Sequence, residues 1–259
     1  MIQDLLRGDA ERPSLRALAF PARLLLTLFL LGTAAGLAAG EGNVLASHAE
    51  ADGRPGLSME DLRRVYHGRP GWTLIASKVD GGSMEKNVPV PSERRAILDW
   101  ARSGATREGF DGARKVLDLR CVKCHSPGGE KGESPFAEAR EAGARWDLVR
   151  EYAKPDRGMT TAARATTTHA HLFSLSALLA LLGFVFLLTN TRRAVKAAVV
   201  ALPFAGMFLD VGCWWLSLWS PAAVAGIVAG GTMLAAGTLI LVVRPLWEMW
   251  GPEPRGLRI

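Results

Sequence analysis

Cysteine is scarce in this sequence. The 259 residues contain three, of which Cys121 and Cys124 lie close together and Cys213 lies alone in an apolar segment, where we expect a small apolar filler. A structural zinc site needs a second pair of ligands, and residues 41–168 contain no other Cys pair or Cys/His pair. A nucleophile with its supporting residues, a phosphate-binding loop and a second metal cluster are also missing. The sequence therefore carries no signature of a zinc domain or of a substrate cleft.

Long apolar runs are confined to the two ends of the chain, although 49% of all residues are hydrophobic. The four runs cover residues 15–40, 170–189, 197–219 and 222–243. Each is close to the ~20 residues that a helix needs to cross about 30 Å of hydrocarbon. We therefore expect a mainly α protein, with a four-helix transmembrane bundle and an exported α-helical domain between spans one and two.

Basic residues flank these spans on one side. Lys and Arg next to a span tend to stay in the cytoplasm. They lie before span one, between spans two and three, and after span four, as Arg7, Arg12, Arg16, Arg23, Arg192, Arg193, Lys196, Arg244, Arg255 and Arg258. The link between spans three and four, Ser220 and Pro221, has no charge. We expect both termini in the cytoplasm and the central domain on the periplasmic side of a bacterial inner membrane.

The chain accordingly divides into three parts. Residues 1–40 hold the cytoplasmic flank and span one, residues 41–168 the periplasmic domain, and residues 169–259 spans two to four with a short cytoplasmic tail. The net charge of +6 comes largely from the cytoplasmic flanks, so it predicts no nucleic-acid partner. The first apolar run also has the form of a signal peptide, but its long charged leader favours an uncleaved anchor.

The segment Cys121-Val-Lys-Cys124-His125 has the C-x-x-C-H spacing of a covalent haem site. Two thiols on one turn can form thioethers with the two vinyl groups of a haem, and the adjacent imidazole can bind the iron as proximal ligand. A redox dithiol of thioredoxin type would need a βαβ context, which this Gly-rich region does not offer. We therefore expect one covalent haem c.

Residues 66–126 resemble the class I cytochrome c family, in particular the short membrane cytochromes of planctomycete type, with the two halves in rotated order. Three segments look like the second half of that domain, and the fourth, which runs into Cys121, looks like the first half: Gly68–Ile75, Gly82–Met84, Pro91–Ala105 and Phe110–Arg120. The resemblance implies a class I cytochrome fold with Met84 as distal iron ligand. Its first and last helices would pack together across the short link at residues 104–109.

Each of these two expected helices has an apolar stripe. The stripes consist of Ile97, Leu98, Trp100 and Ala101 on one helix and of Val116, Leu117 and Leu119 on the other. We expect them to close over the haem edge.

The distal ligand remains open between several residues. Met84 has the family context, whereas Met159 follows the haem motif in the conventional chain order. A Met thioether raises the haem potential relative to a second His. Met59, His48 and His67 are further candidates, and a vacant distal position is another alternative.

The spans contain a few polar residues, which are costly in a membrane and usually functional. His169, His171 and Asp210 lie towards the same side and predict either a quinol-oxidising cluster or a polar clasp between spans two and three. An interfacial belt of Trp214, Trp215 and Trp219 follows Asp210. In span four, the G-x-x-x-G pair Gly226 and Gly230 predicts close helix packing, within the chain or in a dimer.

These patterns favour an electron carrier over an independent enzyme. The expected protein is a membrane-bound mono-haem c-type cytochrome, which works with other membrane subunits of a respiratory or related complex and with a soluble redox protein. One alternative is a quinol-oxidising subunit in which His169, His171 and Asp210 feed the haem. A second alternative is a haem-based redox or gas sensor.

Overall fold

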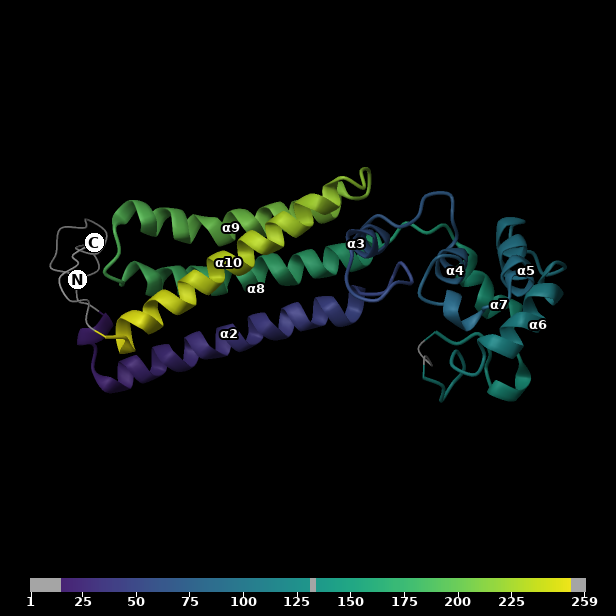
Figure 1. Ribbon diagram of the computed structural model, residues 1–259, viewed down its shortest axis with the longest axis horizontal. Coiled ribbons are helices and arrows are strands. Elements are labelled where there is room, and N and C mark those ends of the chain that lie inside the picture. The colour runs from purple at the N-terminus through teal and green to yellow at the C-terminus, as the bar shows by residue number, and fades with distance from the viewer. Residues whose placement is uncertain (1–14, 131–133, 253–259) are drawn as a thin grey trace. The chain divides into compact units, whose positions relative to one another are not determined.

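The computed structural model describes residues 15–130 and 134–252 (Figure 1). Over these residues the chain is helical, and the β pairing consists of an isolated antiparallel bridge between Thr73 and Pro155. The chain forms two compact units, which we call the membrane unit (1–44 with 161–259) and the central unit (45–160). The central unit thus begins and ends inside the expected periplasmic segment, because the long helices before and after it extend beyond their apolar runs.

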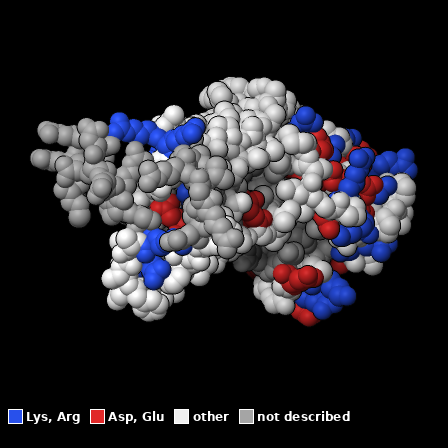
Figure 2. Space-filling model, turned by 60° about the vertical axis from the view of Figure 1, so that its left-hand side comes forward, with Lys and Arg blue, Asp and Glu red and all other residues white. Residues whose placement is uncertain are grey.

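Among the residues that the structure describes, four helices are long and apolar enough to cross a membrane, and all four belong to the membrane unit, so the expected number of spans is confirmed. They are α2 (Phe20–His48), α8 (Thr161–Leu187), α9 (Arg193–Leu216) and α10 (Ala223–Trp250). Many large apolar side chains on their outer faces are exposed, as a lipid-facing surface requires. In Figure 2 the surface of the bundle is largely white, whereas blue and red side chains mix on the surface that belongs to the central unit.

Helices α9 and α10 approach each other closely along a row of glycines. A Cβ atom added to Gly230 would lie 2.4 Å from the backbone nitrogen of Asp210, and one added to Gly226 would lie 2.3 Å from the Sγ atom of Cys213. At Gly230, where the neighbouring atoms belong to the backbone of α9, a larger residue would force the two helices apart. The G-x-x-x-G pair of span four is therefore used within this chain, against α9, and Cys213 fills the contact as a small apolar residue.

A buried carboxylate joins three segments at the end of the bundle where α8 leads into α9. Glu248 accepts hydrogen bonds from the backbone N–H of Asn190 at 2.8 Å and of Leu15 at 3.4 Å, the latter in the short helix η1 (Leu15–Ala17). Arg16 donates to the carbonyl of Gly251 at 2.7 Å. Several of the described basic residues that flank the spans thus lie at this end of the bundle. Arg7, Arg12, Arg255 and Arg258 lie outside the described residues.

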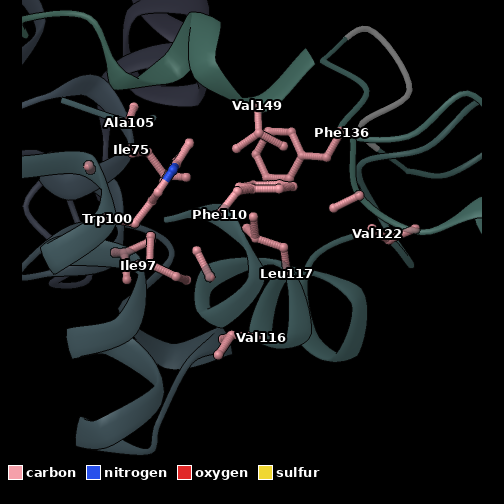
Figure 3. Close-up of a cluster of buried hydrophobic side chains, with 14 of the residues drawn as sticks. Ile75, Ile97, Trp100, Ala105, Phe110, Val116, Leu117, Val122, Phe136 and Val149 are labelled. Atoms are coloured by element: carbon pink, nitrogen blue, oxygen red, sulfur yellow. The ribbon is translucent and has the colours of Figure 1, made fainter. Parts of the chain in front are cut away.

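The central unit is built from short helices around one hydrophobic core. They are α3 (Met59–Tyr66), α4 (Leu74–Val79), η2 (Glu85–Asn87), α5 (Pro91–Arg102), α6 (Phe110–Arg120), η3 (Arg140–Ala142), α7 (Trp146–Val149) and η4 (Arg150–Ala153). Figure 3 shows the core side chains converging from α4, α5, α6 and the segments that follow the C-x-x-C-H motif. We call this set of side chains the core cluster.

Helices α5 and α6 form an antiparallel pair. Glu93 at the start of α5 receives two hydrogen bonds from Arg120 at the end of α6, at 2.9 and 3.0 Å. At the other end of the pair the rings of Trp100 and Phe110 lie 5.1 Å apart between centroids. The expected packing of these two helices through a short link is thus present.

The expected apolar stripes are buried with one exception. Ile97, Leu98, Trp100 and Ala101 are buried on α5, and Val116 and Leu117 on α6. Leu119 is 66% exposed, so its expected place in the stripe was wrong. Two residues along a helix correspond to a rotation of about 200°, which turns Leu119 to solvent when Leu117 faces the core.

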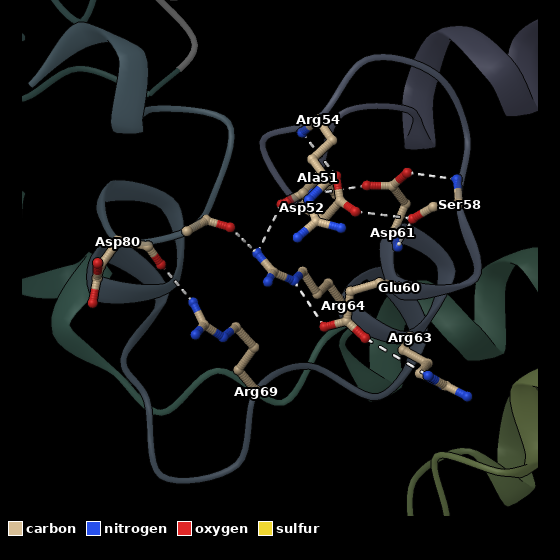
Figure 4. Close-up of polar contacts among 11 residues, drawn as sticks. Ala51, Asp52, Arg54, Ser58, Glu60, Asp61, Arg63, Arg64, Arg69 and Asp80 are labelled. Atoms are coloured by element: carbon tan, nitrogen blue, oxygen red, sulfur yellow. Dashed lines mark hydrogen bonds and ion pairs between the residues drawn. The ribbon is translucent and has the colours of Figure 1, made fainter. Parts of the chain in front are cut away.

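The loop that enters α3 is held by its own polar side chains (Figure 4). Ser58 and Asp61 form a capping box, and the fully buried Asp61 also accepts from the N–H of Asp52 at 2.7 Å. A hydrogen bond from the backbone of Arg54 lowers the pKa of Asp52. Arg64 continues the network by donating to the carbonyls of Ala51 and Gly81. These groups satisfy one another and give the loop a structural role.

Candidate functional site

The C-x-x-C-H motif forms a tight turn directly after α6. Cys121 caps the helix through its N–H, which donates to Leu117 at 2.8 Å. The N–H groups of Cys124 and His125 both donate to the carbonyl of Cys121, at 3.0 and 2.9 Å. Both thiols and the imidazole are thus presented from one turn, which is the arrangement that attachment to two vinyl groups and one iron requires.

The chain after the motif folds back over it. Gly129 makes this return possible, since a Cβ atom there would lie 2.6 Å from the carbonyl oxygen of Cys124. Farther along, the N–H of Phe136 donates to the carbonyl of His125 at 2.6 Å, and the two rings stack with centroids 4.6 Å apart and an interplanar angle of 11°. The imidazole is therefore packed against one face of a buried phenyl ring.

A backbone carbonyl sets the tautomer of His125. Its Nδ1 atom lies 3.2 Å from the oxygen of Ser134. A carbonyl can only accept, so Nδ1 is assigned as the donor in this contact. Iron-binding and zinc-binding histidines are commonly oriented by such a contact from the nitrogen that does not bind the metal.

Burial makes Cys121 a poor thiolate. Desolvation, with a smaller contribution from Cys124, raises the pKa of the Cys121 thiol to about 11. Cys121 also packs against the core cluster. At neutral pH it is a protonated thiol held at the edge of an apolar core, in contrast to the low-pKa cysteine of a dithiol oxidoreductase.

Among the distal-ligand candidates, Met84 packs against the core cluster, as Cys121 does. Its Sδ atom lies 3.6 Å from the amide nitrogen of Asn87 in the adjoining turn. Gly82 allows the segment before Met84 to lie close to α4, because a Cβ atom there would lie 2.2 Å from the carbonyl oxygen of Ser77. The glycine two residues before Met84 thus serves a close backbone contact.

The other candidates lie around α3. The N–H of Met159 donates to Val65 at 2.7 Å, and Met59 is 39% exposed at the start of the helix. His67 caps the end of α3, and the ring of His48 lies against Tyr66 with centroids 5.8 Å apart. Of the five, Met84 is the residue that packs against the core cluster.

The residues present therefore fit a haem c. They supply two thiols and an imidazole from one turn, and a thioether that packs against the core cluster. A group of three or more His, Cys, Asp and Glu side chains that could hold a metal ion is not found within residues 15–130 and 134–252.

The polar residues expected to act together in the spans lie at two separate positions. The edge of His171 meets the ring of Trp214 with centroids 5.1 Å apart, and the indole N–H of Trp214 donates to Asp210 at 3.0 Å. His169 is two residues from His171, about 200° around α8, and stacks on Phe173. The structure thus connects His171 to Asp210 through Trp214 and leaves His169 on another face. Of the three tryptophans expected at the interface, Trp214 is buried inside the bundle and Trp219 is 75% exposed.

A buried arginine at the start of α8 had no place in the sequence analysis. Arg164 is fully buried and donates to the carbonyl of Trp214 and, at 3.0 Å, to the hydroxyl of Ser217 at the end of α9. Thr168 accepts a bond from Trp215 at 3.0 Å. A cation suits the carbonyl end of a helix. In the sequence, the sign of this buried arginine was a single charged residue shortly before an apolar run.

The comparisons with known proteins bear on the membrane unit. A family of transmembrane helical domains matches residues 153–256, which include α8, α9 and α10. No curated protein and no solved structure matches the chain. Over its last three spans, the chain is similar to a family of transmembrane helical domains.

Proposed function

We propose that this protein is a membrane-anchored mono-haem c-type cytochrome that transfers electrons on the periplasmic side of a bacterial inner membrane. It would work as a subunit of a respiratory or related complex, with other membrane subunits and a soluble redox protein as partners. The observation that carries the proposal is the turn after α6, which presents Cys121, Cys124 and His125 together and orients the imidazole against Ser134.

Each of these residues has a defined task. A bound haem c supplies a reversible one-electron redox centre. Cys121 and Cys124 would hold it through two thioethers, and His125 would offer the lone pair of Nε2 to the iron. Phe136 shields one face of the imidazole from water. Met84 would be the distal ligand, because it packs against the core cluster.

The membrane unit supports an anchoring role. Its four apolar helices hold the protein in a bilayer. The connection from His171 through Trp214 to Asp210, with Arg164 bound to the end of α9, favours a polar clasp over a quinol-oxidising cluster of His169, His171 and Asp210. The clasp ties α8 to α9 next to the point where the chain enters the membrane unit.

Covalent haem is the direct test. The protein is produced with the cytochrome c maturation machinery, denatured, separated in a gel and stained for haem peroxidase activity. Staining is expected in the unchanged protein and in Cys213→Ser, whose thiol is buried in α9. The double variant Cys121→Ser/Cys124→Ser should lose the stain. A double variant that stains like the unchanged protein would contradict the proposal.

A further inference from the structure

The carboxylate of Asp118 on α6 holds the stretch of chain that comes back over the C-x-x-C-H motif. We call this stretch, residues 134–145, the return segment. Near its end, the N–H of Ala144 donates to Oδ1 of Asp118. Ala144 is buried, and Asp118 lies three residues before Cys121 on the helix that leads into the motif. The last turn of α6 is thus bound to chain that follows the motif.

Gly143 makes this contact possible. Its φ of +72° is a conformation that side chains disfavour, and a Cβ atom there would lie 2.9 Å from Oδ1 and 3.1 Å from Oδ2 of Asp118. The glycine therefore leaves room for the carboxylate beside the N–H of Ala144. Arg114 also lies 3.7 Å from Asp118, but both of these side chains are largely exposed, and such ion pairs contribute little. The hydrogen bond to Ala144 is therefore the stronger of the two contacts.

Further hydrogen bonds connect this anchor to the imidazole of the motif. The residue after Ala144, Arg145, donates its N–H to the carbonyl of Phe136 at 2.8 Å, which closes a loop within the return segment. Phe136 donates to the carbonyl of His125 at 2.6 Å and stacks on its ring. The carbonyl of Ser134 lies 3.2 Å from Nδ1 of His125. These three contacts on His125 all come from the return segment.

The return segment has little rigidity of its own. Within residues 134–145, all of which the structure describes, the regular structure is the short helix η3. A single 3₁₀ turn adds little stiffness to a chain. The contacts at the two ends of the segment therefore determine where it lies, and one of those ends is bound by Asp118.

We propose that Asp118 is a positioning residue for His125. Through Ala144 the carboxylate fixes the return segment, and the return segment fixes the orientation of the imidazole. Histidines that bind a metal are commonly held by such contacts from outside the ligand set. The role of Asp118 toward a haem rests on the proposed function, whereas the anchoring of the segment does not.

The test compares variants of the full-length protein in lipid nanodiscs. Asp118→Ala removes the acceptor, Asp118→Asn keeps an oxygen for Ala144, and Asp111→Ala removes another exposed carboxylate of α6 as the matched control. In haem-free protein, hydrogen exchange of the Phe136 and Ala144 amides should be about tenfold faster in Asp118→Ala, because a hydrogen bond to a charged group is lost. The other two variants should exchange like the unchanged protein.

Protein with covalent haem provides a measurement of the imidazole itself. The electron paramagnetic resonance spectrum of a ferric low-spin haem depends on the orientation of its axial ligands. The g values should shift in Asp118→Ala and be restored in Asp118→Asn. Gly143→Ala should shift them as well, since its Cβ atom displaces a carboxylate that is otherwise intact. Asp111→Ala should leave them unchanged.

The outcomes separate this inference from the proposed function. Equal exchange in Asp118→Ala and the unchanged protein would overturn the anchor. Faster exchange with unchanged g values would overturn the positioning role, because the carboxylate would then only stabilise the segment. A sample without haem stain would overturn the cytochrome, and the exchange of the Phe136 amide would then decide by itself whether Asp118 holds the segment on His125.

Discussion

The phenyl ring of Phe136 lies flat on the imidazole of His125, with centroids 4.6 Å apart, and its N–H donates to the carbonyl of the same histidine. Phe136 also belongs to the core cluster. Truncation to Phe136→Ala should therefore destabilise the central unit by about 3–5 kcal/mol, as loss of a buried phenyl ring usually does. Urea unfolding followed by tryptophan fluorescence measures the change. Leu119→Ala, at an exposed position of the same unit, should stay within about 0.5 kcal/mol.

The distal ligand can be assigned by spectroscopy. If Met84 binds the iron, Met84→Ala should remove the weak sulfur-to-iron absorption band of the oxidised protein and lower the haem potential, because a thioether favours ferrous iron. Met159→Ala should keep both properties, since Met159 is held beside α3. A band lost in Met159→Ala would show that the conventional chain order applies. A band that survives in both variants would point to a His or an open position and revive the sensor alternative.

The raised pKa of Cys121 predicts slow alkylation of haem-free protein. With the pKa at about 11, roughly one thiol in a thousand is ionised at pH 8, against about a tenth for an ordinary cysteine. The rate with iodoacetamide, measured in a Cys124→Ser/Cys213→Ser variant, should therefore keep rising beyond pH 9. Loss of Cys124 removes only the smaller contribution to the shift. A rate that levels off near pH 9 would show that the thiol is solvated.

The contact between α9 and α10 offers a pair of neighbouring glycines for comparison. A Cβ atom on Gly230 would collide with the backbone of Asp210, whereas one on Gly231 meets nothing within 4 Å. Gly230→Ala should cost about 1–3 kcal/mol through overpacking, and Gly231→Ala should be neutral or slightly stabilising. Thermal unfolding in detergent distinguishes them. Equal midpoints for the two variants would be incompatible with the tight helix pair.

The orientation of the bundle can be tested with a phosphatase that folds only in the periplasm. Fusion after Gly128 should give an active enzyme, and fusion after Arg193 should not, because the basic residues near α8 and α9 favour the cytoplasm. The contact of Arg16 with Gly251 places the two outer segments at one end of the bundle, so fusion after Gly251 should also be inactive. The reverse pattern of activity would invert the topology.

Several features of this protein follow from the sequence alone. Runs of about twenty apolar residues must form helices in a membrane, because every backbone polar group has to be satisfied internally. The number of spans was therefore readable, as were the apolar stripe of α5 and the packing of α5 on α6. The turn at the C-x-x-C-H motif was also predictable, because the residues that form it are neighbours in the chain.

Other features depend on contacts between distant residues. Leu119 looked like a core position, but the rotation that buries Leu117 exposes it. The sequence analysis assigned no role to Arg164 or Glu248, yet both are buried, because segments far away in the chain supply their hydrogen-bond partners. The sequence suggested that His169 and His171 act together, but the two residues lie on different faces of α8. Local spacing determines which groups are available, whereas only the packing of helices far apart in the chain decides which of them meet.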